Sequence, residues 1–203
     1  MSRTFGLIPA AGKSQRMGRP KLALPLGGRT VLEAVVTAVR QACAEAVVVV
    51  LSPGAEGLTA LAEKAGATVL RLPSDTAEMR DTIEHGLDWI EETFQPTIKD
   101  GWLLLPADHP CVESAVIQRL LEARTQHPNH SIFVPTVDGR RGHPVWIGWQ
   151  HVAAIRALPR GQGVNAYLRA QAAVTREVAV TEASVLWDLD TPEDYERLGG
   201  RLE

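Results

Sequence analysis

The residues best suited to chemistry lie in the stretch 5–21, FGLIPAAGKSQRMGRPK, where an apolar segment ends at Pro9 and three small residues follow. Four cations come next, within nine residues: Lys13, Arg16, Arg19 and Lys21. Small residues let backbone N–H groups approach an anion, and cations neutralise its charge. An ordinary turn with solvated charges is less favoured, because Met17 and Pro20 interrupt the cations. The stretch therefore predicts a loop that holds phosphate.

Two common phosphate-binding motifs do not match this loop. The tripeptide GKS at 12–14 has the ending of a P-loop, but that motif needs another glycine at the position of Leu7. Gly6 lies one residue too early. A dinucleotide-binding fold needs G-x-G-x-x-G after its first strand, and the loop has only Gly12 and Gly18. ATPases, GTPases and dinucleotide-dependent enzymes are therefore disfavoured.

Carboxylates stand at two other places where a metal could bind. Asp108 follows the most apolar predicted strand, 102–105, and so falls at the carboxyl edge of a parallel sheet, where ligands bind. Asp188 and Asp190 share a face if their segment is a strand, since side chains repeat every two residues. Mg²⁺ prefers such oxygen ligands. Each has a plainer interpretation, because Asp108 could form a turn and Asp190 could turn the chain before a helix.

The rest of the chain has the pattern of a sheet that could bring these residues to one edge. Apolar segments of strand length alternate with helical patterns, which is typical of a parallel α/β fold. Strands are expected near residues 5–8, 47–51, 68–72, 102–105, 131–136, 143–147 and 175–180. Helices are expected near 30–44, 58–64, 83–90, 114–124, 149–157, 164–172 and from Thr191 onward. Thr30 and Glu33 have capping-box spacing, and Thr191 with Pro192 forms an N-cap followed by a first helical proline.

The composition predicts one globular domain, residues 1–203, with 45% hydrophobic and 22% charged residues. A net charge of −3 disfavours a general nucleic-acid or membrane-surface binder. No apolar segment reaches the roughly 20 residues of a membrane span, and no secretory signal pattern is present. Cys43 and Cys111 are far apart in sequence, as expected for reduced thiols. We therefore expect a cytoplasmic protein that binds neither nucleic acid nor a membrane.

The phosphate loop resembles the signature of nucleotidyltransferases with a GT-A-like α/β fold. Their pattern is Ala-Ala-Gly-x-Ser-x-Arg-Met-Gly followed by Pro-Lys, and this chain has AAGKSQRMG at 10–18 and PK at 20–21. The resemblance implies a three-layer αβα sandwich with a mostly parallel, Rossmann-like sheet. It also implies that Arg16 holds the β- and γ-phosphates and that Lys21 lies on the α-phosphate. The nucleotide-contacting residues that it implies are Pro9, Ala10, Ala11, Gly12, Thr82 and Ala107.

Three further segments resemble the molybdenum cofactor cytidylyltransferase branch of these enzymes. ADHP at 107–110 is similar to a metal-binding Ala-Asp-x-Pro element, and WDLDTPED at 187–194 to an Asp-x-Asp-Thr-Pro-Glu-Asp block. The resemblance implies that Asp108 binds Mg²⁺ together with Asp190 or Asp188. RGHPV at 141–145 resembles a hairpin beside the acceptor, which implies contacts from Gly142 and His143.

The sequence departs from this branch at two places. EMRDTI occupies 78–83 where the branch has Gly-Met-Ser-x-Ser-Leu, so Thr82 keeps a hydroxyl but Arg80 is expected to alter the charge of the pocket. GQGVN occupies 161–165 where the branch has Gly-Asp-x-Gly-x-Arg. These differences fall more on the acceptor side than on the triphosphate side.

The resemblance implies a Mg²⁺-dependent transfer of a nucleoside monophosphate, with release of pyrophosphate. CTP and molybdopterin are the expected substrates, and a molybdenum hydroxylase is the expected recipient of the product. A sugar-, polyol- or choline-phosphate nucleotidyltransferase is the alternative within this class. A non-catalytic nucleotide-binding module is the alternative outside it.

Overall fold

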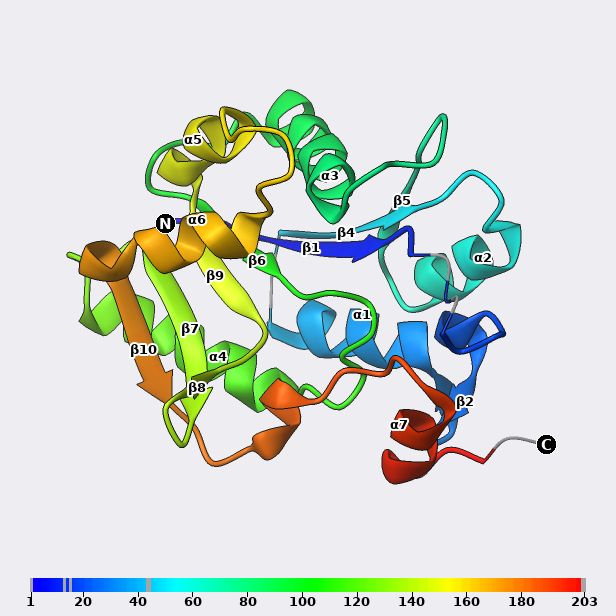
Figure 1. The fold of residues 1–203 in the computed structure, drawn as a ribbon. Coiled ribbons are helices and arrows are strands. Elements are labelled where there is room, and N and C mark those ends of the chain that lie inside the picture. The colour runs from blue at the N-terminus through cyan, green and yellow to red at the C-terminus, as the bar shows by residue number, and fades with distance from the viewer. Residues whose placement is uncertain (1, 13, 15, 43–44, 202–203) are drawn as a thin grey trace.

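The central sheet is the framework of the molecule. The computed structural model describes residues 2–12, 14, 16–42 and 45–201, so Lys13 and Cys43 lie outside the described residues. Within these residues eight strands form one sheet (Figure 1). Their order is β10 (Thr175–Ala179), β7 (Ile132–Val137), β9 (Val145–Gly148), β6 (Gly101–Leu104), β1 (Thr4–Ala10), β4 (Ala46–Leu51) and β5 (Thr68–Arg71), with β8 (Arg140–Arg141) paired to β7. Strand β9 is antiparallel to β6 and β7, β8 is antiparallel to β7, and the other pairs are parallel. The mostly parallel sheet is therefore confirmed.

Helices cover both faces of this sheet, which confirms the expected αβα layers (Figure 1). One face carries α3 (Met79–Phe94), α5 (Val152–Arg156) and α6 (Val164–Ala170). The other carries α1 (Val31–Ala42), α2 (Glu56–Lys64) and α4 (Ser114–Gln126). The hairpin of β2 (Pro25–Leu26) and β3 (Arg29–Thr30), helix α7 (Pro192–Arg197) and the 3-10 turns η1 (Lys21–Ala23), η2 (Trp149–His151), η3 (Ala172–Val174) and η4 (Ala183–Leu186) complete the chain. No helix in the described part of the chain is long and apolar enough to span a membrane.

Strand β1 supplies both halves of the hydrophobic core, because successive side chains point to opposite faces of the sheet. Phe5 and Leu7 pack in the layer of α3, whereas Ile8 and Ala10 pack in the layer of α1. All residues of β1 are buried. A parallel strand covered on both faces is apolar throughout, which explains the continuous apolar segment in the sequence.

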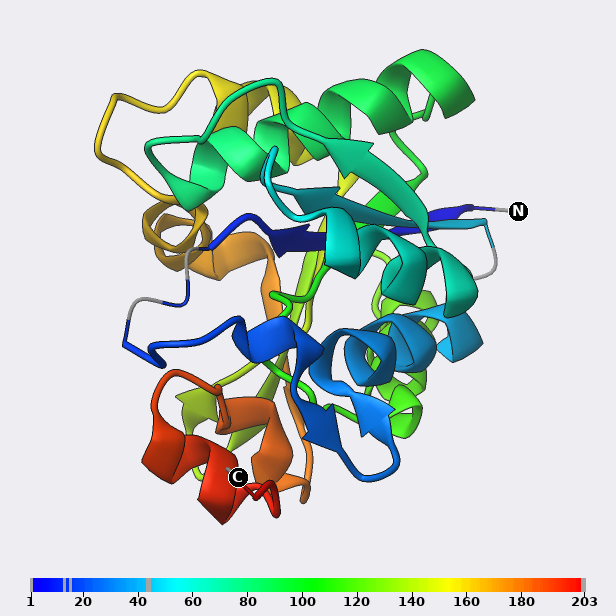
Figure 2. The same ribbon diagram turned by 90° about the vertical axis from the view of Figure 1, so that its right-hand side faces the viewer.

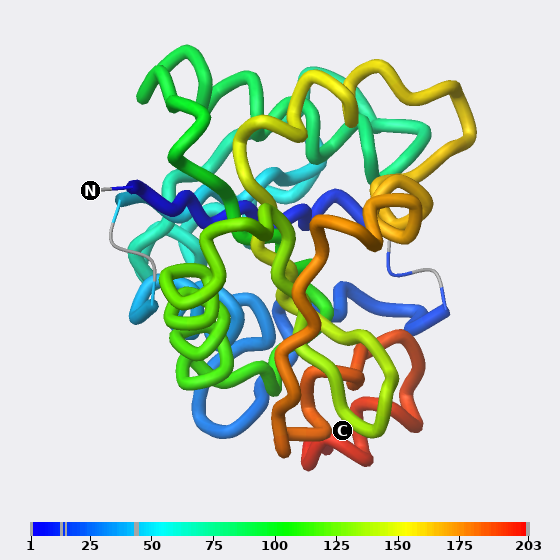
Figure 3. The backbone as a smooth tube through the Cα atoms, turned by 90° about the vertical axis from the view of Figure 1, so that its left-hand side faces the viewer, coloured from blue at the N-terminus to red at the C-terminus, as the bar shows by residue number. Residues whose placement is uncertain are grey.

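Most of the expected elements are present, with shifts at their ends. The capping box at the start of α1 is confirmed, because Thr30 N donates to Glu33 Oε2 (2.8 Å) and Glu33 N donates to Thr30 Oγ1 (3.2 Å). The strand expected from residue 143 begins at 145. Pro144 has no N–H to donate to a neighbouring strand, which accounts for the later start. At the other edge of the sheet, β10 runs beside β7 (Figure 3).

The loop that follows β6 runs beside the carboxyl end of β1. Leu105 N donates to Leu7 O (3.2 Å), and Ala107 N donates to Pro9 O (3.3 Å). The small-residue loop and the segment carrying Asp108 are thus brought to one edge of the sheet.

Helix α3 packs closely on the sheet at Gly86, and this contact gives a stability prediction. A Cβ at this position would lie 2.3 Å from Leu7 Cδ1 and 3.1 Å from Val50 Cγ2. We expect Gly86→Ala to lower the free energy of unfolding by about 1–2 kcal/mol, because overpacking outweighs the gain in helix propensity. Urea unfolding followed by circular dichroism measures the change.

The matched control is Gly57→Ala in α2, where a new Cβ has no neighbouring atom within 4 Å. This variant should be as stable as the wild type or slightly more stable. Equal stability of the Gly86 variant and the control would contradict the close packing of α3 on β1.

Candidate active site

A cleft of about 590 Å³ opens at the edge of the sheet where β1 and β6 end. All six residues expected to contact the nucleotide line it, and so do Arg16, Lys21, Asp108 and Asp190. The cleft lies between residues 75–79, which lead into α3, and Lys21 and Leu22 of η1. The structure thus gathers residues from the first and the last parts of the chain around one cavity.

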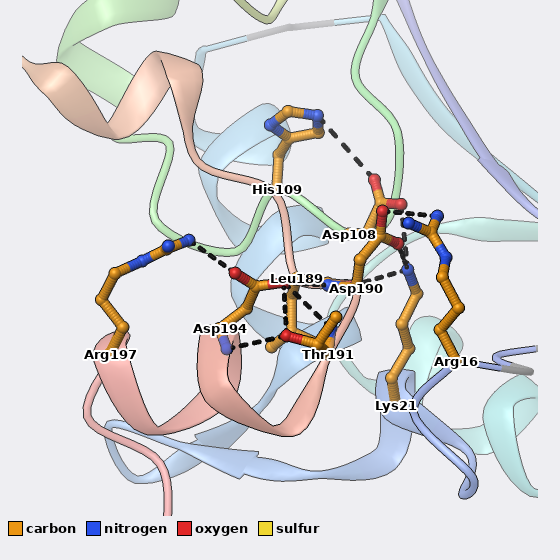
Figure 4. Close-up of polar contacts among 9 residues, drawn as sticks. All are labelled: Arg16, Lys21, Asp108, His109, Leu189, Asp190, Thr191, Asp194 and Arg197. Atoms are coloured by element: carbon orange, nitrogen blue, oxygen red, sulfur yellow. Dashed lines mark hydrogen bonds and ion pairs between the residues drawn. The ribbon is translucent and has the colours of Figure 1, made fainter.

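The ammonium group of Lys21 joins three segments of the chain (Figure 4). Its Nζ lies 3.0 Å from Asp108 Oδ2 and 3.0 Å from Asp190 Oδ1, and it donates to Leu189 O at 2.7 Å. The Lys21 side chain is only 11% exposed. A charge with so little access to water needs such partners, because burial of an unpaired charge is costly.

Arg16 binds the second oxygen of Asp190 but remains open to solvent. Its Nη2 lies 2.7 Å from Asp190 Oδ2, and its side chain is 71% exposed (Figure 4). The guanidinium group therefore stands at the mouth of the cleft, where most of its donors can reach an anion.

The C-terminal segment is fixed in place on both sides of Asp190. Leu189 N donates to Asp108 O at 2.8 Å, which attaches this segment to the loop after β6. The predicted N-cap is confirmed, because Thr191 Oγ1 accepts from Asp194 N at the start of α7. The buried Tyr195 donates its hydroxyl hydrogen bond to Pro25 O. Asp190 is thus held in place by the hydrogen bond of Leu189 on one side and by the capped helix α7 on the other.

Asp188 and Asp190 do not share a face as expected. Residues 187–190 form no strand in the described structure, and the 3-10 turn η4 precedes them. Asp190 turns to Lys21, whereas Asp188 is exposed and does not line the cleft. Leu189, which lies between them, is bound through its N–H to the carbonyl oxygen of Asp108 and is not part of the sheet.

Gly142 and His143 lie beside a second, smaller cavity of about 220 Å³. Its floor is apolar and its rim carries two arginines; the other lining residues are Ile132, Val134, Arg141, Val145, Asn165, Leu168, Arg169 and Thr175. The His143 ring packs on the His109 ring, with 4.7 Å between the ring centroids. His109 directly follows Asp108, so this pair of rings connects a residue that lines the cleft to one that lines the smaller cavity.

Both imidazole rings are held in the neutral form. Burial, with a smaller contribution from the neighbouring His109, lowers the pKa of His143 to about 4. Burial also lowers the pKa of His109, and the carboxylates of Asp108 and Asp188 oppose this effect only in part. The two imidazole rings next to Asp108 therefore carry no charge at neutral pH.

Arg80 does not alter the charge of the cleft, contrary to expectation. Its side chain is buried and turns to carbonyl groups of the segment between α5 and α6. Thr82 does line the cleft, and its hydroxyl lies 2.8 Å from that of Thr76.

Several lining residues were not predicted from the sequence: Ser14, Leu22, Asp75, Thr76, Ala77, Glu78 and Met79. Those at 75–79 follow β5, whose carboxyl end lies at the same edge as those of β1 and β6. Their position after a predicted strand is the sequence signal that could have placed them at the cleft.

The oxygen atoms of the cleft suit a divalent cation. The described residues contain no cluster of three or more His, Cys, Asp or Glu side chains around one point. Asp108 and Asp190 nevertheless converge on the Lys21 ammonium, and a cation with two carboxylates can complete its shell from phosphate and water. This donor set fits Mg²⁺ or Mn²⁺ better than a metal that prefers sulfur or nitrogen.

Comparison with known proteins gives full-length and partial relatives. A family model described as the MobA-like NTP transferase domain matches residues 6–175. The molybdenum cofactor cytidylyltransferase of Escherichia coli K12 is 22% identical over 195 residues, 96% of this chain and 95% of the relative. Nicotine blue oxidoreductase of Paenarthrobacter nicotinovorans is 28% identical over 200 residues, 95% of each chain. A 2-C-methyl-D-erythritol 4-phosphate cytidylyltransferase of Thermus thermophilus is 52% identical over 99 residues, 47% of this chain and 44% of the relative.

Solved structures share the fold over nearly the whole chain. Rv0371c of Mycobacterium tuberculosis H37Rv has a TM-score of 0.82 and 28% identity, covering 97% of this chain and 98% of that one. The complex of Rv0371c with manganese has a TM-score of 0.78 and 27% identity over the same shares.

The neutral state of His143 predicts a change of stability with pH. Its folded pKa of about 4 lies below the ordinary 6.5, so the unfolded chain takes up this proton first as the pH falls. Stability from this group is complete above pH 6.5 and is lost toward pH 4, by up to about 3 kcal/mol. Urea unfolding at pH 7.5 and pH 5 should therefore show a smaller acid loss for His143→Gln than for the wild type. An identical acid loss in both proteins would contradict a buried neutral ring.

Proposed function

This chain belongs to the MobA-like NTP transferase family, and we propose that it transfers a nucleoside monophosphate from a nucleoside triphosphate to a phosphorylated acceptor. The family and its structural relatives are nucleotidyltransferases, cytidylyltransferases among them. The observation that carries the proposal is the Lys21 ammonium, held by two carboxylates inside a cleft that the small-residue loop borders.

The triphosphate lies along the loop after β1 in this proposal. Residues 10–12 offer backbone N–H groups without bulky side chains in the way. Arg16, largely exposed at the mouth of the cleft, binds the β- and γ-phosphates that leave as pyrophosphate. Lys21 lies at the α-phosphate and neutralises the charge that grows there in the transition state.

The reaction needs no general base from the chain. An oxygen of the acceptor phosphate is already ionised near neutral pH, and it forms the new bond to the α-phosphorus as the bond to the β-phosphate oxygen breaks. The chain positions the reacting groups and stabilises charge, which are the main contributions to phosphoryl-type transfer. The neutral His109 and His143 fit this scheme, because neither is needed as a proton acceptor.

Asp108 and Asp190 hold the divalent cation in this proposal, with Asp190 preferred over the exposed Asp188. We propose Mg²⁺, which when bound would neutralise phosphate charge; the manganese complex of Rv0371c supports a divalent ion in this fold. Gly142 and His143, beside the smaller cavity, face the acceptor side.

CTP and molybdopterin are the proposed substrates, supported by the full-length likeness to a molybdenum cofactor cytidylyltransferase. The product would then pass to a molybdenum hydroxylase in the cytoplasm. A polyol phosphate is the second candidate acceptor, favoured by the 52% identity to the methylerythritol phosphate enzyme over 99 residues.

Pyrophosphate release across a matrix of substrates distinguishes these possibilities. The matrix pairs CTP, GTP, ATP and UTP with molybdopterin and with polyol, sugar and choline phosphates, in the presence of Mg²⁺. We expect release with CTP and molybdopterin to exceed the other pairs by about 100-fold or more. A rate confined to a polyol or sugar phosphate would exclude molybdopterin. Binding without turnover in any pair would favour a non-catalytic module, and redox turnover alone would favour the activity named for the oxidoreductase relative.

Lys21 provides the sharpest test of the proposed chemistry. Lys21→Met should lower kcat by about 10³-fold, with a smaller effect on the KM for the triphosphate, because Lys21 acts mainly in the transition state. The matched control is Arg19→Met, which removes an exposed cation of the same loop that does not line the cleft. Similar losses in both variants would mean that the loop attracts phosphate only through its overall charge.

A further inference from the structure

Arg80 is a buried arginine whose contacts lie outside the cleft. It stands in the first turn of α3 and is 8% exposed. Its Nη1 donates to the carbonyl oxygens of Leu158 (2.9 Å), Pro159 (2.9 Å) and Gln162 (3.1 Å). Its Nε lies 3.3 Å from Glu84 Oε1, one helical turn further along α3. The guanidinium group thus joins α3 to residues 157–163, between α5 and α6. We name these residues the bridging loop, and its backbone lies beside the start of α3 (Figure 2).

The bridging loop is exposed except for the half-buried Leu158, yet three of its carbonyl groups turn inward. Gly161 adopts a φ of +82°, in the left-handed region that favours glycine. Inward carbonyl groups need a donor, because a buried polar group without a partner is costly. The three oxygens converge on a single nitrogen of Arg80, so this side chain defines the conformation of the loop.

A second contact connects the bridging loop to the wall of the cleft. Gly161 N donates to Glu78 Oε1 at 3.1 Å. Glu78 lines the cleft, as does Met79, and these two residues directly precede Arg80. The capping box of α3 also passes through Glu78, whose N–H donates to Asp81 Oδ2 at 3.1 Å. The wall formed by residues 75–79 is therefore held between the start of α3 and the bridging loop.

We propose that Arg80 is a positioning residue, which fixes the 75–79 wall of the cleft by holding the bridging loop against it. The two departures of the sequence from the cytidylyltransferase branch, at Arg80 and at 161–165, thus form one structural unit. The part of the proposal that concerns nucleotide affinity rests on the proposed function, because a nucleotide bound in the cleft would lie beside this wall.

The first test is hydrogen exchange measured by mass spectrometry on the unliganded protein. Arg80→Met should raise the exchange of amides in the bridging loop and also in residues 75–79. Arg80→Lys should restore much of the protection, because one ammonium offers three donors to the three converging carbonyl groups. Faster exchange confined to the bridging loop, or no change in either segment, would overturn the proposal.

Arg156→Met is the matched control. Arg156 also connects α5 to α3, through Asp88 (2.6 Å) and Glu91 (2.7 Å), but it binds α3 further from the cleft. Loss of these two ion pairs should leave the exchange of residues 75–79 unchanged. An equal rise in both variants would show a general loosening of α3 and would also overturn the proposal.

The second test is CTP binding in the presence of Mg²⁺, measured by calorimetry. Arg80→Met should weaken binding by about five- to fiftyfold, with Arg80→Lys between it and the wild type. An unchanged affinity in Arg80→Met would overturn the role in binding. Failure of the wild type itself to bind any triphosphate would overturn the proposed function, and the exchange experiment would then decide the role of Arg80 alone.

Discussion

The ion-pair network around Lys21 is the interaction on which the site depends. One ammonium group contacts Asp108 from the loop after β6 and both Leu189 and Asp190 from the C-terminal segment. These contacts span 87, 168 and 169 positions of the sequence. A nearly buried charge must be compensated by polar partners. The strand ends, the turn η1 and the capped helix α7 must therefore bring these partners within hydrogen-bond distance of the Lys21 ammonium group. The fold can be understood as the scaffold that meets this requirement at one edge of the sheet.

The charges are arranged differently on two sides of Asp108. On the side of the cleft, Lys21 contacts the carboxylates of Asp108 and Asp190, and Arg16 contacts that of Asp190. On another side of Asp108, the adjacent rings of His109 and His143, tilted by 58° to each other, stay neutral because burial disfavours their charged forms. Because these rings are neutral, the cationic partners that the structure gives Asp108 and Asp190 are Lys21 and Arg16, at the cleft. The second cavity, which His143 lines, differs from the cleft in having buried apolar residues such as Ile132 and Val145 in its wall.

Local sequence signals predicted the parts of the site that depend on local structure. The small-residue loop, the capping box of Thr30 and Glu33 and the position of Asp108 after an apolar strand each follow from a few neighbouring residues. The antiparallel direction of β9, the turning of Asp190 rather than Asp188 to Lys21, and the contacts of Arg80 could not be predicted in this way. Each depends on a partner far away in sequence, such as the carbonyl of Asp108 that binds Leu189 or the bridging loop that binds Arg80. A charged residue at position 80 looked like part of the pocket because sequence spacing does not reveal which way a side chain turns.

The contact of Lys21 with Asp190 has a consequence for the order in which the chain folds. The two residues are 169 positions apart in the sequence, so their ion pair closes a very long loop. Contacts of large sequence separation must overcome more loop-closure entropy than the shorter-range pairing of neighbouring strands. We therefore expect the sheet and most of the cleft to form before Asp190 joins Lys21 and Arg16, so that the charge pattern of the site is completed late in folding.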